Sequence, residues 1–215
     1  MVRAPRNSQG IDALKSSEGP EQPPTTDPDV RLMLRLKAGD QSAFGELFEK
    51  HSRAIVNFAY HFVGSRERAE EITQDVFLQV YRAAGRYEPQ ARFTTWLYRV
   101  ARNACLNEVR RPEYRHARRP LERETDDPGG RGEIALPDPA APEGERALAG
   151  RQLEAKIREA LAALPESQRA ALLMSRTEGM SYRDVAEALA CTESAVKSLV
   201  FRATAALRKA LEEFL

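Results

Sequence analysis

Residues 181–211 read SYRDVAEALACTESAVKSLVFRATAALRKAL and predict two helices separated by a tight break. Ser181 and Asp184 have the spacing of a capping box in front of the first helix. Thr192 is suited to be the N-cap of the second helix, with Glu193 in its first turn. The LACT segment between the helices supplies the short break that a helix-turn-helix requires.

The second helix of this pair has two chemically different sides when its residues are placed at intervals of about 100°. The apolar side carries Val196, Leu199, Val200, Ala203 and Leu207. The opposite side carries Ser194, Lys197, Ser198, Phe201 and Arg202. Basic, hydroxyl and aromatic side chains on one face suit the major groove of DNA, because they can reach phosphates, guanine edges and thymine methyl groups. An ordinary solvated face would not explain Phe201, which points away from the apolar side.

The composition limits the other classes of protein that the chain could be. The 215 residues are 30% charged with a net charge of +1, so the sequence is not typical of a protein that coats nucleic acid nonspecifically. Cys105 and Cys191 lie far apart and outside any CxxC pair, so we expect two half-buried thiols, with no disulfide, metal site or cofactor. No apolar run approaches the ~20 residues of a membrane span, and no signal-peptide stretch opens the sequence. We expect a cytoplasmic protein.

Periodicity along the chain predicts an all-α fold with two small helical domains joined by a flexible acidic linker. Residues 1–27 are rich in Pro, Ser and Gly and are expected to be disordered. A first domain spans 28–111, with its helices opening at Pro28 behind the N-cap Asp27, after the caps Asp40 and Ser65, and near Thr94. Residues 112–146 form the linker, which is acidic and interrupted by Pro and Gly. The second domain spans 147–215 and ends in the helix-turn-helix.

The first domain carries polar residues that its core does not explain. Glu71, Gln74 and Asp75 share one side of the helix that follows Ser65. Residues 86–92 then interrupt the helices with Pro89. The next helix is basic and has Trp96 and Tyr98 among its cations, which suits single-stranded or melted nucleic acid; Trp96 could equally be a core anchor. Its polar residues are Arg99, Arg102, Asn103, Arg110 and Arg111.

Five segments in this order resemble the extracytoplasmic-function (ECF) sigma factors, small members of the sigma-70 family that have only regions 2 and 4. The resemblance covers about residues 30–111 and 150–211. The segments are GDQSAF (39–44), EEITQDVFLQVYR (70–82), FTTWLYRVARNACLNEVRR (93–111), LPESQRAALLMSRTEGMSYRDVAEAL (164–189) and CTESAVKSLVFRATAALRKAL (191–211).

The resemblance implies a role for each group of residues in transcription initiation. Glu71, Gln74 and Asp75 would bind core RNA polymerase. The 86–92 loop would capture a flipped base of the −10 promoter element, and the helix after it would hold the DNA backbone. The implied −10 residues are Arg86, Tyr87, Gln90, Arg92, Arg99, Arg102, Asn103, Arg110 and Arg111. The implied −35 residues are Tyr182, Arg183, Lys197, Ser198, Phe201 and Arg202.

Two departures from the family pattern affect these expectations. Primary sigma factors have two adjacent tryptophans where the duplex is wedged open, whereas this chain has Trp96-Leu97. Promoter melting should therefore depend more on the base-capturing loop. An arginine often found just before the turn is replaced by Ser175, with Arg176 following, which puts one phosphate contact in doubt.

The resemblance also implies an anti-sigma factor as a partner, and two other functions stay open. The linker is either a solubilising tether or a segment that occupies a basic polymerase channel. A free-standing helix-turn-helix regulator would account for 181–211 but not for the polar groups of the first domain. An enzyme acting on DNA would need a nucleophile or a carboxylate metal cluster, and the three histidines are scattered along the chain.

Overall fold

A computed structural model describes residues 27–111, 143–176 and 179–212. Every regular element within these ranges is helical, which confirms the predicted all-α fold. The predicted disordered extension lies outside the described residues apart from Asp27, and the predicted linker lies outside them apart from residues 143–146. Those four residues belong to a helix, which begins earlier than the predicted start near Ala147. None of the described helices is long and apolar enough to cross a membrane.

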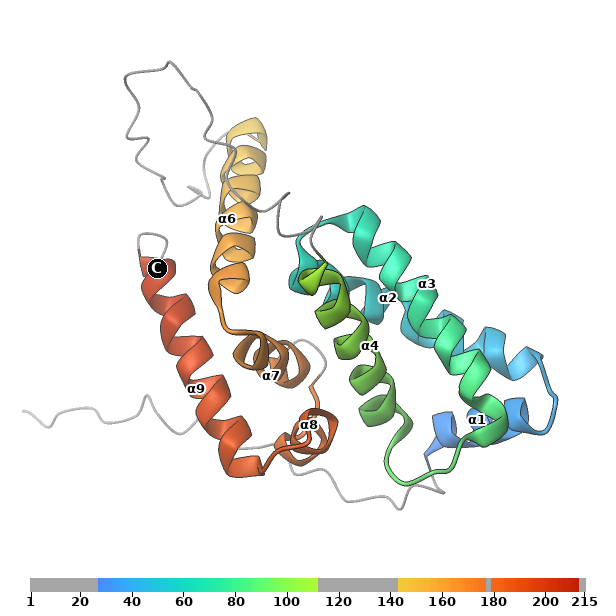
Figure 1. Cartoon of the computed structure of the whole chain (residues 1–215). Coiled ribbons are helices and arrows are strands. Elements are labelled where there is room, and N and C mark those ends of the chain that lie inside the picture. Colours follow the sequence, from blue (N-terminus) through green and yellow to red (C-terminus); the bar gives the residue numbers. More distant parts are fainter. Residues whose placement is uncertain (1–26, 112–142, 177–178, 213–215) are drawn as a thin grey trace, which may run out of the picture.

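The N-terminal half, residues 27–111, packs its helices around a shared apolar core (Figure 1). Phe58, Phe62, Phe77 and Phe93 are its largest buried side chains. Each such ring contributes about 1.5–3 kcal/mol by leaving water. The elements are α1 (Pro28–Lys37), α2 (Ser42–Val63), α3 (Arg66–Ala83), the 3-10 turn η2 (Ala84–Arg86) and α4 (Phe93–Arg110).

Two of the caps that the sequence predicts in this half, Asp27 and Ser65, are formed, whereas Asp40 lies one residue before the N-cap of α2, Gln41. Asp27 accepts a hydrogen bond from the N–H of Asp29, and Pro28 opens α1. Asp40 accepts from the N–H of Ser42 at the start of α2. Ser65 accepts from the N–H of Arg68 in α3. These side chains satisfy N–H groups that a helix cannot pair internally, and they therefore fix where each helix begins.

The C-terminal half, residues 143–212, ends in the predicted helix-turn-helix. Asp184 donates its N–H to Ser181 Oγ at 3.1 Å, and Ala195 donates its N–H to Thr192 Oγ1 at 3.2 Å. Ala190 makes the break with a left-handed backbone, φ 53°. The elements are α6 (Glu143–Ala163), α7 (Glu166–Arg176), α8 (Tyr182–Leu189) and α9 (Glu193–Ala210).

Ala190→Gly should stabilise the protein by about 1 kcal/mol, because a left-handed conformation strains any residue that has a Cβ. The matched control is Ala205→Gly, an exposed position inside α9, which should instead cost about 1 kcal/mol. Urea unfolding curves of the two variants should move in opposite directions. A destabilised Ala190→Gly protein would show that the turn does not carry this strain.

The two halves are packed against each other. Figure 1 shows α4 facing α7 and α8, and one continuous cluster of buried residues joins Phe62 to Leu161 and Met174. The buried Arg169 of α7 donates to the carbonyl oxygen of Phe62 at 2.6 Å, and its guanidinium lies 5.1 Å from the centre of the Phe62 ring. The C-terminal half is therefore seated on the end of α2.

The two cysteines differ in exposure. Cys105 is buried in α4, and burial raises the pKa of its thiol to about 12. Cys191 is exposed at the turn between α8 and α9. The prediction of two half-buried thiols is therefore wrong for both residues, because burial at each position is decided by tertiary packing.

Candidate nucleic-acid interface

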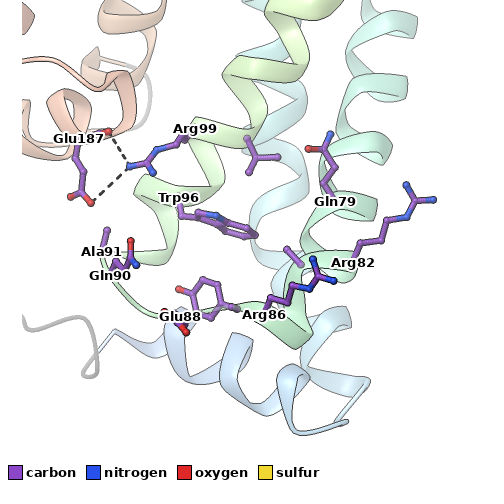
Figure 2. Close-up of a pocket in the computed structure, with 12 residues that line it drawn as sticks. Gln79, Arg82, Arg86, Glu88, Gln90, Ala91, Trp96, Arg99 and Glu187 are labelled. Carbon is purple, nitrogen blue, oxygen red and sulfur yellow. Dashed lines mark hydrogen bonds and ion pairs between the residues drawn. The ribbon is translucent and has the colours of Figure 1, made fainter.

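An open pocket of about 820 Å³ lies between η2 and the first turns of α4. Its wall includes the pocket loop, which we define as residues 86–92. Figure 2 shows Trp96 in the middle of this pocket, with Gln79 and Arg82 of α3 on one side and Glu88 and Gln90 of the loop below. The volume is in the range of ligand pockets, about 300–1,000 Å³, and an unstacked base is one such ligand.

The predicted residues of the pocket loop do not all face solvent. Arg86, Gln90 and Arg92 are exposed. Tyr87 is only 5% exposed, and its ring meets Trp96 edge-on at 5.4 Å. Burial raises the pKa of Tyr87 to about 12, with the nearby Asp27 carboxylate adding to the effect. In this arrangement Tyr87 forms the wall of the pocket, and Gln90 and Arg86 are the side chains available at its mouth.

Three arginines of the pocket loop and α4 contact oxygen atoms of the C-terminal half. Arg92 lies 3.6 Å from Asp184, and Arg99 donates to the backbone oxygen of Glu187 at 3.0 Å. Further along α4, Arg110 lies 3.1 Å from Glu166. Exposed ion pairs contribute only about 0–1 kcal/mol each. Replacing the Glu166 carboxylate, whose side chain is 38% exposed, with a DNA phosphate would therefore cost little.

The remaining predicted residues of α4 have partners within the helix or next to it. Arg102 donates to the side-chain oxygen of Asn103 at 3.5 Å, and Asn103 is exposed. Arg111 lies 3.0 Å from the buried carboxylate of Glu108. The structure thus places all the predicted −10 residues on the pocket loop and along one helix.

The predicted polymerase-binding residues form an exposed row on α3. Glu71, Gln74 and Asp75 all face solvent, and Glu71 accepts a hydrogen bond from Arg68 at 2.7 Å. The row continues at Leu78, whose side chain is exposed although it is apolar. Beside it, Tyr81 of α3 and Phe48 of α2 both pack against Phe44, and like Leu78 they are large side chains that the core covers only in part.

This apolar patch, consisting of Phe48, Leu78 and Tyr81, was not recognised in the sequence. Phe48 comes directly after the buried Leu47 on α2, yet it is 41% exposed and meets the buried Phe77 edge-on at 4.9 Å. Leu78 lies four residues after Gln74 and therefore on the same side of the helix as Glu71 and Gln74. That spacing could have identified part of the patch from the sequence. Exposed apolar patches of this kind mark contact surfaces for other macromolecules.

The buried and exposed sides predicted for α9 are both present. Val196, Val200 and Ala203 are buried on one side. Phe201 is 75% exposed on the other, although it is a large apolar side chain. The remaining residues of this face are also exposed: Ser194, Lys197, Ser198 and Arg202. On α8, Arg183 is exposed and Tyr182 is partly buried.

Ser175 and Arg176, where the chain departs from the family pattern, lie at the end of α7. Ser175 is partly buried and donates to the carbonyl oxygen of Leu172 at 3.2 Å. Its hydroxyl is thus directed back along α7, and Arg176 is the exposed cation there. Within the described ranges, no three His, Cys, Asp or Glu side chains come together in a way that could hold a metal ion.

Comparison with known proteins identifies the family of the chain. Residues 47–115 match the family model of Sigma-70 region 2, and residues 154–207 match that of Sigma-70, region 4. The RNA polymerase sigma-H factor of Pseudomonas aeruginosa is 34% identical over 89% of this chain and 97% of its own length. The ECF RNA polymerase sigma factor SigM of Mycobacterium tuberculosis is 33% identical over 85% of this chain and 84% of its own.

Two solved structures share the fold. One is CnrH in complex with the cytosolic domain of CnrY, with a TM-score of 0.64 and 24% identity over 86% of this chain and 98% of that chain. The other is the sigma factor RpoE from Bartonella quintana in complex with the anti-sigma factor NepR, with a TM-score of 0.55 and 21% identity over 79% of this chain and 96% of that chain. The chain belongs to the sigma-70 family, in its extracytoplasmic-function group. Members of this family are transcription initiation factors.

Proposed function

We propose that this protein binds core RNA polymerase, directs it to a specific set of promoters and assists melting of the −10 element. The observation that carries the proposal is the exposed face of α9, where Phe201 is 75% exposed beside Lys197 and Arg202. Such a face, opposite a buried apolar side, matches a recognition helix for the major groove at −35. The family membership supports the same role.

The pocket loop is the proposed −10 reader. A flipped base would enter the pocket beside Trp96, with Gln90 and Arg86 at its mouth. The arginines of α4 would hold the backbone of the melted strand by charge. The exposed row on α3, extended by the apolar patch, is the proposed docking surface for core polymerase. The protein would thus act by binding, and the chemistry of RNA synthesis would belong to the polymerase.

Control by an anti-sigma factor is part of the proposal. RpoE of Bartonella quintana shares the fold and is seen bound to the anti-sigma factor NepR. A free-standing regulator is less well supported, since it would leave the row on α3 and the pocket without a use. Specific binding to a palindromic duplex in the absence of polymerase would favour that regulator.

The proposal is tested by run-off transcription with purified bacterial core polymerase on upstream fragments of the protein's own operon. The wild type should start RNA at a defined site. Arg202→Ala should bind core normally but lose about 1–3 kcal/mol of promoter affinity, as expected for a lost base contact. Arg53→Ala, an exposed arginine on α2 outside both DNA surfaces, is the matched control.

Two outcomes would contradict the proposal. A protein that never joins core polymerase yet shifts duplex DNA by itself would be a regulator of the free-standing kind. An Arg202→Ala protein with wild-type promoter affinity would remove α9 from the −35 contact.

A further inference from the structure

Helix α1 holds the pocket loop at both of its ends. Near the start of the loop, Lys37 in the last turn of α1 donates from Nζ to the carbonyl oxygen of Tyr87 at 2.8 Å. At the other end, Asp27 Oδ2 accepts from the backbone N–H of Phe93 at 3.0 Å. Figure 2 shows α1 running beneath the loop, between these two ends.

Asp27 caps two helices at once. Its Oδ1 accepts from the N–H of Asp29 and so caps α1. Its Oδ2 caps α4, whose own N-cap residue, Arg92, makes no side-chain capping bond. Unpaired N–H groups at a helix start need an acceptor, and here the acceptor comes from a residue far earlier in the sequence. The first turn of α4, where the pocket loop ends, therefore depends on the position of α1.

Helix α1 is itself firmly anchored. Asp29 is 4% exposed and accepts from Lys50 Nζ at 2.6 Å, and its other oxygen lies 2.9 Å from Nε2 of His51. Burial works to raise the pKa of Asp29, but the hydrogen bonds from His51 and Lys50 outweigh it and hold the pKa below its ordinary value. Val30 and Met33 are fully buried on the same helix. The two loop contacts are thus made from a rigid support.

Between its two held ends, the pocket loop leaves Gln90 exposed at the mouth of the pocket. Tyr87 is buried against Trp96, whereas Glu88 and Gln90 are exposed. A backbone fixed in advance lets a loop bind without having to be ordered in the same step. This arrangement suits a loop that captures one extruded base.

We propose that Lys37 and Asp27 are positioning residues for −10 recognition: they fix the backbone of the pocket loop from outside the −10 surface. The proposal rests on the function proposed above for that loop. Lys37→Met keeps the length of the side chain but removes its ammonium group. Asp27→Asn keeps a cap for α1 but leaves one acceptor oxygen for two N–H groups.

The first readout needs no DNA. Trp96 is the single tryptophan of the chain and lies in the pocket, so its quenching by acrylamide in the full-length protein reports on the loop. Lys37→Met and Asp27→Asn should make Trp96 more accessible to acrylamide, and Lys37→Arg should restore the wild-type value. Lys156→Met on α6 removes an equivalent charge far from the loop and should change nothing. Thermal unfolding of each variant checks that it is folded.

The second readout is binding by the holoenzyme to two probes taken from the mapped promoter, a single-stranded −10 oligonucleotide and a −35 duplex. Lys37→Met should weaken −10 binding about three- to ten-fold, the cost of ordering a loop on binding, and leave −35 binding unchanged. Equal losses on both probes, or unchanged −10 affinity, would overturn the positioning role. A wild type with no defined start site would overturn the proposed function and the −10 role together, while the quenching data still decide whether α1 fixes the loop.

Discussion

Gln74→Ala combined with Asp75→Ala should abolish stable association with core RNA polymerase. Both side chains are exposed on α3, in the row that continues to Leu78. Alanine is the best helix former, and neither side chain belongs to the buried core, so the variant should fold normally. The expected effect is therefore on the interface alone.

The size of this effect follows from the energetics of interfaces. Central contact residues each cost about 2 kcal/mol or more when truncated to alanine, so the double variant should bind core at least ~100-fold more weakly. Fluorescence anisotropy with labelled protein and purified core measures the affinity. Glu49→Ala with Asn57→Ala removes a carboxylate and an amide from exposed positions of α2 and is the control. Wild-type affinity in the α3 variant would place the docking surface elsewhere.

Arg169→Ala should lower the free energy of unfolding by about 3 kcal/mol or more, because it leaves buried polar groups without partners. Arg169 is 3% exposed and donates to the carbonyl oxygens of Phe62 and Ala162, both at 2.6 Å, and of Leu164 at 3.1 Å. Its guanidinium also covers the Phe62 ring. One side chain thus joins the turn between α6 and α7 to the end of α2.

Urea unfolding measures this prediction. Arg176→Ala, an exposed arginine in the last turn of the same helix, should change stability by no more than about 0.5 kcal/mol. Arg169→Lys retains the charge but cannot reach three carbonyls with a planar fork, so an intermediate loss is expected. A loss below about 1 kcal/mol in Arg169→Ala would mean that water or neighbouring groups satisfy these carbonyls.

The sequence predicted the features that depend on neighbouring residues. Asp27, Ser65 and Thr192 mark helix starts because a cap and the N–H that it satisfies lie within three residues of each other. The two sides of α9 follow from the period of a helix, and the burial of Val196 opposite the exposed Phe201 confirms them. The family resemblance rested on the same local segments and is confirmed by both region matches.

Features that depend on distant residues could not be predicted in this way. The burial of Tyr87 depends on Trp96 and on the approach of α1 to the loop. The exposure of Phe48 depends on how α2 and α3 pair, because periodicity cannot say which part of an apolar side is left uncovered. The second role of Asp27, as the cap of α4, joins residues that no local pattern connects.

The difference in exposure between the two cysteines makes it possible to measure the distance between the two halves of the protein in solution. A thiol reacts as its thiolate, so Cys105, buried and with its pKa raised to about 12, stays inert while Cys191 can be labelled selectively with a maleimide dye. The label then sits in the C-terminal half, and the single tryptophan sits in the N-terminal half. The wild-type sequence therefore already supplies both positions needed for a fluorescence energy-transfer measurement: Trp96 as the donor and Cys191 as the attachment point for the acceptor dye. Its signal would report whether α8 leaves α4 when polymerase or promoter DNA is added.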